Sequence, residues 1–123
     1  MFTRKVFVSF DLRNDRKLLR LIKEQTELGY STFMVESWSL SKAASLNWEE
    51  ETRARISRTD RVLVMVGKNT YQNPRVLREV QIALDLGVQV IQMIGYRGME
   101  CKPVPNAGRL YWWDWDILKV LMM

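Results

Sequence analysis

Short apolar runs alternate with segments of helical periodicity along this chain, and this alternation constrains the fold more than any other feature. The runs are continuous rather than alternately polar, which is typical of strands that are buried on both faces. The pattern predicts strands at residues 5–10, 31–36, 61–67, 88–94 and 110–113, and helices at 15–28, 47–60, 74–86 and 114–123. Strands that alternate with helices form a parallel sheet with helices on both faces.

The order of these elements predicts the fold class. We expect an α/β protein with a flavodoxin-like (Rossmann-like) three-layer sandwich, in which a five-stranded parallel sheet has the strand order 2-1-3-4-5. A chain of 123 residues can build one hydrophobic core but not two. Residues 1–123 are therefore expected to form a single domain.

Local signals mark the ends of the helices. Gly29 and Gly87 follow two helical segments as C-terminal glycines do. Asn73 before Pro74 predicts a cap and a proline in the first turn. Asn47, with a glutamate three residues later, resembles a capping box. Residues 37–45 are expected to be a loop.

The composition excludes several kinds of chemistry. The chain has no histidine, so the usual general base, nucleophile pairs and transition-metal ligand are missing, and no metal site is expected. Cys101 is the only cysteine, which rules out an internal disulfide and suits a cytoplasmic location. No apolar run is long enough for a membrane span. The net charge of +5 suits an anionic partner such as a nucleotide, nucleic acid or acidic protein.

The predicted strand order also predicts where a ligand would bind. Open parallel sheets bind ligands beyond the carboxyl ends of their strands, at the switch between strands 1 and 3. The residues expected on that rim are Ser9, Phe10, Asp11, Ser37, Trp38, Gly67, Lys68, Asn69 and Thr70.

Several phosphate-binding motifs are absent from that rim. No glycine pair fits a P-loop, and no glycine-rich turn follows the first strand, which a dinucleotide fingerprint requires. Residues 11–14 do not form the Ser/Thr/Gly-rich turn of a flavin-phosphate site. The third strand ends in Gly67 rather than in a phosphoacceptor aspartate. These four kinds of site are therefore disfavoured.

Glu79 is a charged residue at a position in the helical pattern where an apolar, buried side chain is expected. At 100° per residue it falls within the apolar arc of the helix at 74–86, between Leu86 and Ala83. A carboxylate against an apolar wall is either paired or functional. The spacing of Arg75 and Glu79 allows an i,i+4 ion pair, so both interpretations stay open.

Five segments in order carry a resemblance: Lys5-Val6-Phe7-Val8-Ser9-Phe10, then residues 37–48, 62–70, 76–80 and 112–115. Together they resemble the TIR-like domains of the Thoeris anti-phage sensor type, a branch of the TIR superfamily. The resemblance covers nearly the whole chain.

The resemblance implies cleavage or cyclisation of NAD, which would be substrate rather than cofactor, to nicotinamide and an ADP-ribose signal. It assigns the essential role to Glu79. It also implies self-assembly through TIR–TIR contacts and a separate effector protein that reads the signal. The residues are consistent with this chemistry: a carboxylate can stabilise an oxocarbenium-like state and hold ribose hydroxyls. The Gly67–Thr70 turn with Lys68 is suited to phosphate or ribose, and Phe10 or Trp38 to stacking on a ring.

One position departs from the family pattern. Many TIR domains carry an aromatic residue four positions before the glutamate, and this chain has Arg75 there. This leaves a non-catalytic interaction and assembly module as an alternative function. A nucleotide- or nucleic-acid-binding domain is a third, because basic residues recur along the first helix. For those residues we favour a solvated helix face over nucleic-acid binding. They are Arg13, Arg16, Lys17, Arg20 and Lys23.

Overall fold

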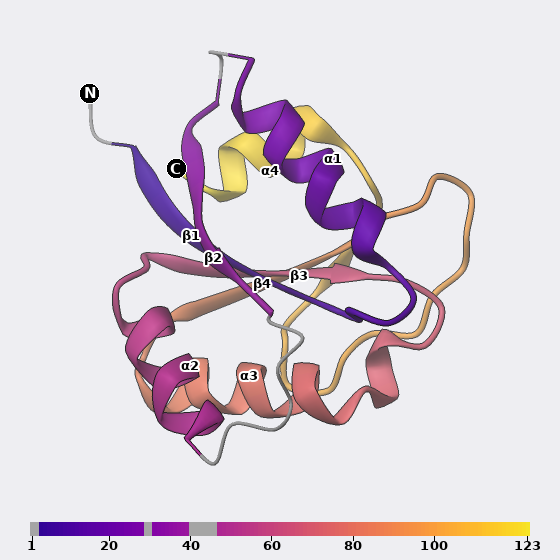
Figure 1. The fold of residues 1–123 in the computed structure, drawn as a ribbon. Helices are drawn as coiled ribbons and strands as arrows, with labels where there is room; N and C mark the ends of the chain where they lie inside the picture. The colour runs from indigo at the N-terminus through magenta and orange to yellow at the C-terminus, as the bar shows by residue number, and fades with distance from the viewer. Residues whose placement is uncertain (1–2, 29–30, 40–46) are drawn as a thin grey trace.

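The computed structural model describes residues 3–28, 31–39 and 47–123. Its sheet has the order β2-β1-β3-β4-β5, and every neighbouring pair is parallel (Figure 1). The strands are β1 (Arg4–Phe10), β2 (Phe33–Trp38), β3 (Arg61–Val66), β4 (Gln89–Ile94) and β5 (Leu110–Tyr111). The helices are α1 (Arg16–Thr26), α2 (Trp48–Ser57), α3 (Pro74–Asp85) and α4 (Trp115–Leu121), with a 3-10 turn, η1, at Thr70–Gln72. The predicted fold class is confirmed.

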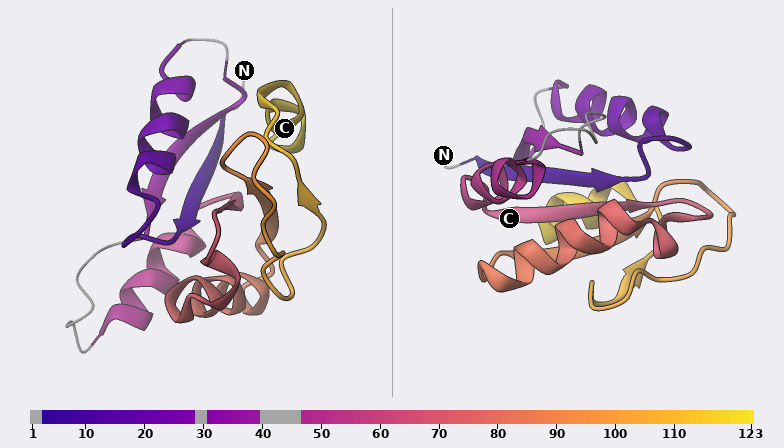
Figure 2. Two further views of the ribbon diagram at one scale, coloured as in Figure 1. Left: turned by 90° about the vertical axis from the view of Figure 1, so that its right-hand side faces the viewer. Right: turned by 60° about the horizontal axis from the view of Figure 1, so that its bottom comes forward.

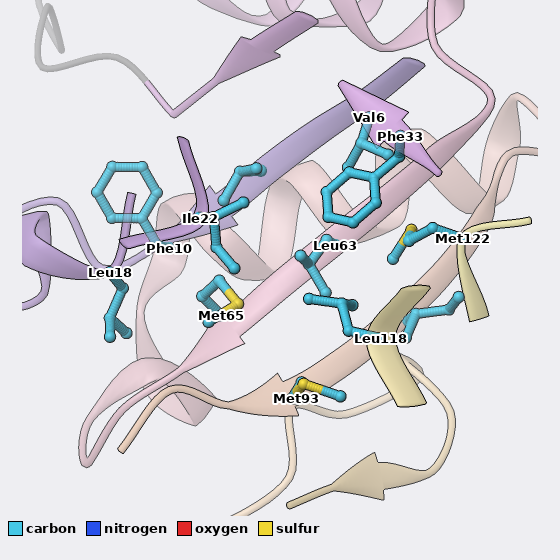
Figure 3. Packing of buried hydrophobic residues seen from close by; sticks show 12 residues of the cluster. Val6, Phe10, Leu18, Ile22, Phe33, Leu63, Met65, Met93, Leu118 and Met122 are labelled. Atoms are coloured by element: carbon cyan, nitrogen blue, oxygen red, sulfur yellow. The ribbon is translucent and has the colours of Figure 1, made fainter. Parts of the chain in front are cut away.

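The sheet separates two layers of helices. Helices α1 and α4 cover one face and α2 and α3 the other, as Figures 1 and 2 show. Alternate side chains of β1 enter the two layers: Val8 and Phe10 pack with α1, and Phe7 packs with α2 and α3. Figure 3 shows the core of the first layer, where Phe10 lies near Leu18 and Ile22 of α1. No helix in the described ranges has both the length and the hydropathy to cross a bilayer.

Strand β2 runs further than the sequence predicts. Ser37 and Trp38 were expected in a loop, but they pair with Phe7 and Val8 of β1 after a register shift. The Ser39 N–H extends the ladder with a 3.0 Å hydrogen bond to the carbonyl of Val8. The shift lets the strand continue past its apolar part, because backbone pairing does not depend on side-chain polarity.

The helix ends agree only partly with the local signals. Asn73 caps α3 as predicted, since its Oδ1 accepts from the N–H groups of Arg75 and Val76. Gly87 follows α3 with a φ of +72°, which favours glycine. The prediction of a capping box is wrong: Asn47 is at the N-cap of α2, but its side chain makes no capping hydrogen bond. Gly29 lies outside the described residues.

The last strand is shorter than predicted. β5 contains only Leu110 and Tyr111, which pair with Gln92 and Met93 of β4. The expected continuation through residues 112–113 is wrong because the chain leaves the sheet to start α4 at the Asp114 cap. An apolar aromatic run cannot by itself show where pairing stops.

Candidate functional site

Glu79 is buried on the α3 side of the sheet, and two hydroxyl groups bind it. Only 1% of the residue is exposed. Its Oε1 accepts a 2.7 Å hydrogen bond from Ser9 Oγ and a 2.6 Å hydrogen bond from Ser39 Oγ. Ser9 comes from β1 and Ser39 from the end of β2, so two strand ends and α3 meet at this carboxylate. Ser39 Oγ also accepts from the Phe10 N–H at 3.2 Å.

The surroundings of Glu79 change its acidity. Burial raises its pKa from 4.5 to about 7, because the charged form loses its hydration. The hydroxyls of Ser39 and Ser9 oppose that rise, and the positive charges of Arg75 and Arg55 oppose it further. Burial therefore favours the protonated carboxyl group at higher pH than in an exposed glutamate. The carboxyl group can change its charge state when a ligand arrives.

Arg55 of α2 holds the end of β2 where Ser39 begins. Its guanidinium donates to the Trp38 carbonyl at 2.9 Å, to Ser37 Oγ at 3.2 Å and to Thr52 Oγ1 at 3.3 Å. It also lies over the ring of Phe7, 5.7 Å from the centroid. Burial lowers the pKa of Arg55, and the charge of Glu79 opposes that change. The residue thus acts on Glu79 both through its charge and through the strand that carries Ser39.

Arg75 stands one turn before Glu79 in the position that is aromatic in many TIR domains. Its guanidinium stacks on the ring of Trp48, 4.5 Å from the centroid. This is a cation–π contact between the first turn of α3 and the first residue of α2. An aromatic ring is therefore present near this position, but α2 supplies it.

On the opposite face of the sheet, α1 and the end of β2 enclose a groove. It has a volume of about 490 Å³. Its apolar walls come from Phe10, Leu12, Leu19 and Trp38, and Ser39 also lines it. The Lys23 ammonium lies 4.5 Å from the centre of the Trp38 ring. Ser39 is the residue that connects this groove with Glu79.

Asp11 stabilises the turn after β1. Its Oδ1 accepts from the N–H groups of Arg13 and Asn14, and its Oδ2 accepts from the Asn14 side-chain amide at 2.7 Å. These bonds form an Asx turn and lead the chain into α1. The residue is 2% exposed.

Asp15, at the N-cap of α1, is a third buried carboxylate beside Glu79 and Asp11. Its Oδ1 accepts from the Tyr96 hydroxyl at 2.6 Å, and within the described residues its Oδ2 has no hydrogen-bond partner. Burial raises the pKa of Asp15, and the Tyr96 hydroxyl opposes that rise. A raised pKa favours the protonated form, which loses less by burial.

The turn after β3 packs against Asp15 rather than Glu79. A Cβ atom on Gly67 would lie 2.3 Å from Asp15 Oδ2. The Gly67 N–H donates to Thr70 Oγ1 at 2.8 Å, and Thr70 is fully buried. Lys68 and Asn69 are exposed. Gly67 and Thr70 therefore hold the turn together, and Lys68 and Asn69 face solvent at the same edge of the sheet.

The predicted site residues thus fall into four groups. Ser37 accepts a hydrogen bond from Arg55, Phe10 and Trp38 line the groove beside α1, and Asp11 lies in the turn after β1. The residues 67–70 form a separate turn. The carboxylate of Glu79 is held by two serine hydroxyls, and the positive charge of Arg75 acts on its pKa as well.

Sequence reasoning missed three functional neighbours. Ser39 carried no signal, because a serine in an expected loop looks like its neighbours until the strand register places it. Arg55 sits on a helix with little amphipathic character, where an inward arginine does not stand out. Asp15 was interpreted only as a helix start, and its contact with Tyr96 spans 81 positions.

Comparison with known proteins supports the fold. The family described as TIR domain matches residues 6–118. No curated protein matches the chain. The match runs from β1 to α4 and includes Ser9, Ser39 and Glu79. This chain therefore belongs to the TIR domain family.

Proposed function

We propose that the protein cleaves the bond between nicotinamide and ribose in NAD, with Glu79 as the catalytic residue. The observation that carries this proposal is the buried Glu79 carboxyl group, which accepts two hydroxyl hydrogen bonds where β1 and β2 end. Membership of the TIR family supports NAD cleavage or a signalling role in general.

The reaction needs little from the protein besides this carboxylate. The C–N bond breaks heterolytically, and its electron pair neutralises the positive charge on the nicotinamide ring nitrogen. The leaving group therefore needs no general acid, which suits a chain without histidine. Glu79 stabilises the oxocarbenium-like cation that remains on the ribose. Water then adds to give ADP-ribose, or a nucleophile within the same molecule adds to give a cyclic product.

The two serines indicate how substrate would engage Glu79. A ribose diol presents two hydroxyl donors, as Ser9 and Ser39 do to Oε1. We infer that ribose hydroxyls take the place of one or both serine hydroxyls when substrate enters. The positively charged nicotinamide ring of the substrate also favours the ionised form of Glu79, so a pKa of about 7 in the free protein does not prevent catalysis. Lys68 and Asn69 are proposed contacts for the phosphates at the same edge.

Nicotinamide release from NAD tests the proposal. The wild-type chain, concentrated or crowded so that it can assemble, is expected to release nicotinamide, and Glu79→Gln is expected to release less than about one hundredth as much. Glu50→Gln, an exposed carboxylate on α2, is the matched control and should keep wild-type activity. No release by assembled protein, or full activity in Glu79→Gln, would disprove it.

We further propose that the product is a signal in defence against phage, read by a separate effector protein. The resemblance to Thoeris-type sensors supports this step. Cells carrying the protein and its neighbouring genes should resist phage, and the Glu79→Gln version should not. Equal resistance with both versions would show that defence does not depend on catalysis by Glu79.

A non-catalytic assembly module is the second candidate, and one surface favours it. On α4, Ile117 and Val120 are 44% and 67% exposed, and Trp112 beside it is 58% exposed. Exposed apolar side chains of this size often mark interaction surfaces. Sedimentation of wild type and Val120→Lys tests this candidate: self-association that the lysine abolishes would support it, and a monomer at all concentrations would not.

A further inference from the structure

We propose that a second groove, beside β5, binds a free amino acid with an apolar side chain. This β5 groove has a volume of about 420 Å³ and lies at the edge of the sheet. Ile94, Leu110 and Trp112 line it together with residues 100–102 of the loop between β4 and β5. None of these residues belongs to the Glu79 site or lines the groove beside α1, so the inference does not depend on NAD cleavage.

The connection between β4 and β5 leaves room for a groove on this part of the sheet. The other three crossovers contain α1, α2 and α3, as is usual between parallel strands. Residues 95–109 contain no helix and cross as a loop instead (Figure 2). Leu110 and Cys101 pack with the core of the α2 and α3 layer. The β5 groove therefore lies on the α3 side of the sheet, where a loop covers what a helix covers elsewhere.

A buried glutamine fixes the loop that forms the β5 groove. Nε2 of Gln92, in β4, donates to the carbonyls of Gly108 at 2.6 Å and Val104 at 3.2 Å. Its Oε1 accepts from the Val104 N–H at 2.8 Å. These hydrogen bonds tie the loop to the sheet directly after residues 100–102. A groove that is held in this way is largely formed before a ligand arrives, which reduces the cost of binding.

The walls of the β5 groove next to the sheet are apolar. Ile94 is buried, Leu110 is half-buried and the indole of Trp112 is exposed. No cation or aromatic ring of the described residues stacks on that indole. Burial raises the pKa of the Cys101 thiol, so this wall is uncharged at neutral pH. Such a surface suits an aliphatic or aromatic side chain of the ligand.

Two opposite charges stand on either side of the Cys101 thiol. Glu100 and Lys102 are exposed, and both line the β5 groove. No salt bridge among the described residues involves either side chain. The Lys102 ammonium lies 5.0 Å from the centre of the Tyr71 ring, a contact that orders the side chain without neutralising its charge.

This pair of charges determines the class of ligand. A carboxylate and an ammonium beside an apolar pocket match the α-ammonium and α-carboxylate groups of an amino acid. A nucleotide would bring its phosphate close to Glu100, which would repel it. A peptide carries its two terminal charges at opposite ends of the chain, so it cannot present both of them here. The charges therefore favour a single zwitterionic amino acid.

NMR titration of the whole chain with L-phenylalanine tests the proposal. We expect saturable shifts of the backbone N–H signals of Cys101, Leu110 and Trp112, with a Kd of about 1 mM or lower. N-acetylphenylalanine lacks the ammonium group and phenylalaninamide lacks the carboxylate. Each should bind about three- to fivefold more weakly than phenylalanine, the effect expected for an exposed ion pair. Glycine lacks the apolar side chain and should not saturate the groove.

Two variants assign each charge of the protein to one group of the ligand. Glu100→Gln should weaken phenylalanine binding about three- to fivefold and leave the binding of N-acetylphenylalanine unchanged. Lys102→Gln should do the same for phenylalanine and leave phenylalaninamide unchanged. Glu50→Gln and Lys5→Gln make the same charge changes at exposed positions elsewhere and should bind phenylalanine as wild type does.

The remaining outcomes separate the β5 groove from the Glu79 site and from assembly. Glu79→Gln should bind phenylalanine as wild type does, whether or not the wild type cleaves NAD. Trp112→Ala should weaken binding, and a thermal melt checks that this variant folds. The proposal would be overturned by no saturation at about 10 mM phenylalanine, by equal losses in Glu100→Gln and Glu50→Gln, or by shifts at the groove that follow protein concentration instead of ligand because a second copy fills it.

Discussion

The Ser39 hydroxyl donates a 2.6 Å hydrogen bond to Oε1 of Glu79, and both groups are almost fully buried. The two residues are forty positions apart: Ser39 directly follows β2, and Glu79 is in α3. The same hydroxyl accepts the N–H of Phe10, so one side chain connects the backbone of β1 to the carboxyl group. The charge state of Glu79 therefore depends on where the end of β2 lies.

Ser39→Ala should raise the pKa of Glu79 above about 7, because the hydroxyl stabilises the ionised carboxylate. It also leaves the buried N–H of Phe10 without its acceptor, at a cost of about 1–3 kcal/mol in unfolding free energy. Carbon-13 NMR titration of the glutamate carboxyl groups measures the pKa, and urea unfolding measures the stability.

Ser57→Ala serves as the control, since its hydroxyl donates to a carbonyl on the exposed end of α2. It should leave the titration of Glu79 unchanged. A Ser39→Ala protein in which Glu79 titrates as in wild type would show that the hydroxyl contributes nothing to the acidity.

Glu79 should make the protein less stable as the pH rises. Its folded pKa of about 7 is above the unfolded value of 4.5, so between these values the folded state binds more protons than the unfolded state. Stability from this group is full below pH 4.5 and falls as the pH rises toward 7. The difference between the two pKa values corresponds to a fall of about 3 kcal/mol in unfolding free energy. Burial leaves little solvent to screen this effect.

Urea unfolding of wild type and Glu79→Gln from pH 4.5 to 8 measures this effect. The glutamine variant should gain stability relative to wild type as the pH rises. Glu50→Gln should follow the wild-type curve. A constant difference between wild type and Glu79→Gln over this range would contradict the raised pKa.

Arg55→Met should act on Glu79 at a distance. It removes three hydrogen bonds, two to the end of β2 and one within α2, which we expect to cost about 1–2 kcal/mol in unfolding free energy. It also removes a positive charge that lowers the pKa of Glu79, so that pKa should rise. The pH profile of NAD cleavage should shift to higher pH with it.

Arg78→Met is the matched control for this variant. Arg78 pairs with Glu49 at 2.8 Å on the exposed surface of α3, and such pairs contribute little. Arg55→Lys keeps the charge but has fewer donors in a different geometry, so it should restore the pH profile more than the stability. An unshifted pH profile in Arg55→Met would limit Arg55 to a structural role.

The sequence allowed more of the fold to be predicted than of the site. Periodicity and apolar runs were enough for the sheet order and for Glu79, because a carboxylate inside an apolar arc is visible from the sequence. The partners of Glu79 were not visible. The register shift between Val6 and Phe7 of β1 pairs Ser37 and Trp38 with the sheet and brings Ser39 within hydrogen-bond distance of Glu79. No side-chain pattern in the sequence encodes a register shift of this kind. Arg55 was hidden for a similar reason, since only the packed structure brings its guanidinium to the Trp38 carbonyl.

Gly67→Ala should destabilise the protein through Asp15. A Cβ atom there would lie 2.3 Å from Asp15 Oδ2 and 2.7 Å from its Cγ, which is closer than atoms can approach. Because Asp15 is buried and held by Tyr96, it cannot move aside freely, and we expect a loss of about 2 kcal/mol or more.

A double-mutant cycle with Asp15→Ala identifies the cause. Removing the carboxyl group removes the three atoms nearest to the new methyl group, so Gly67→Ala should cost much less in the Asp15→Ala background. Gly98→Ala is the comparison, since its φ of +73° strains an alanine although no atom lies nearby, and Asp15→Ala should not relieve that cost. Equal costs of Gly67→Ala in both backgrounds would show that the turn after β3 does not depend on Asp15.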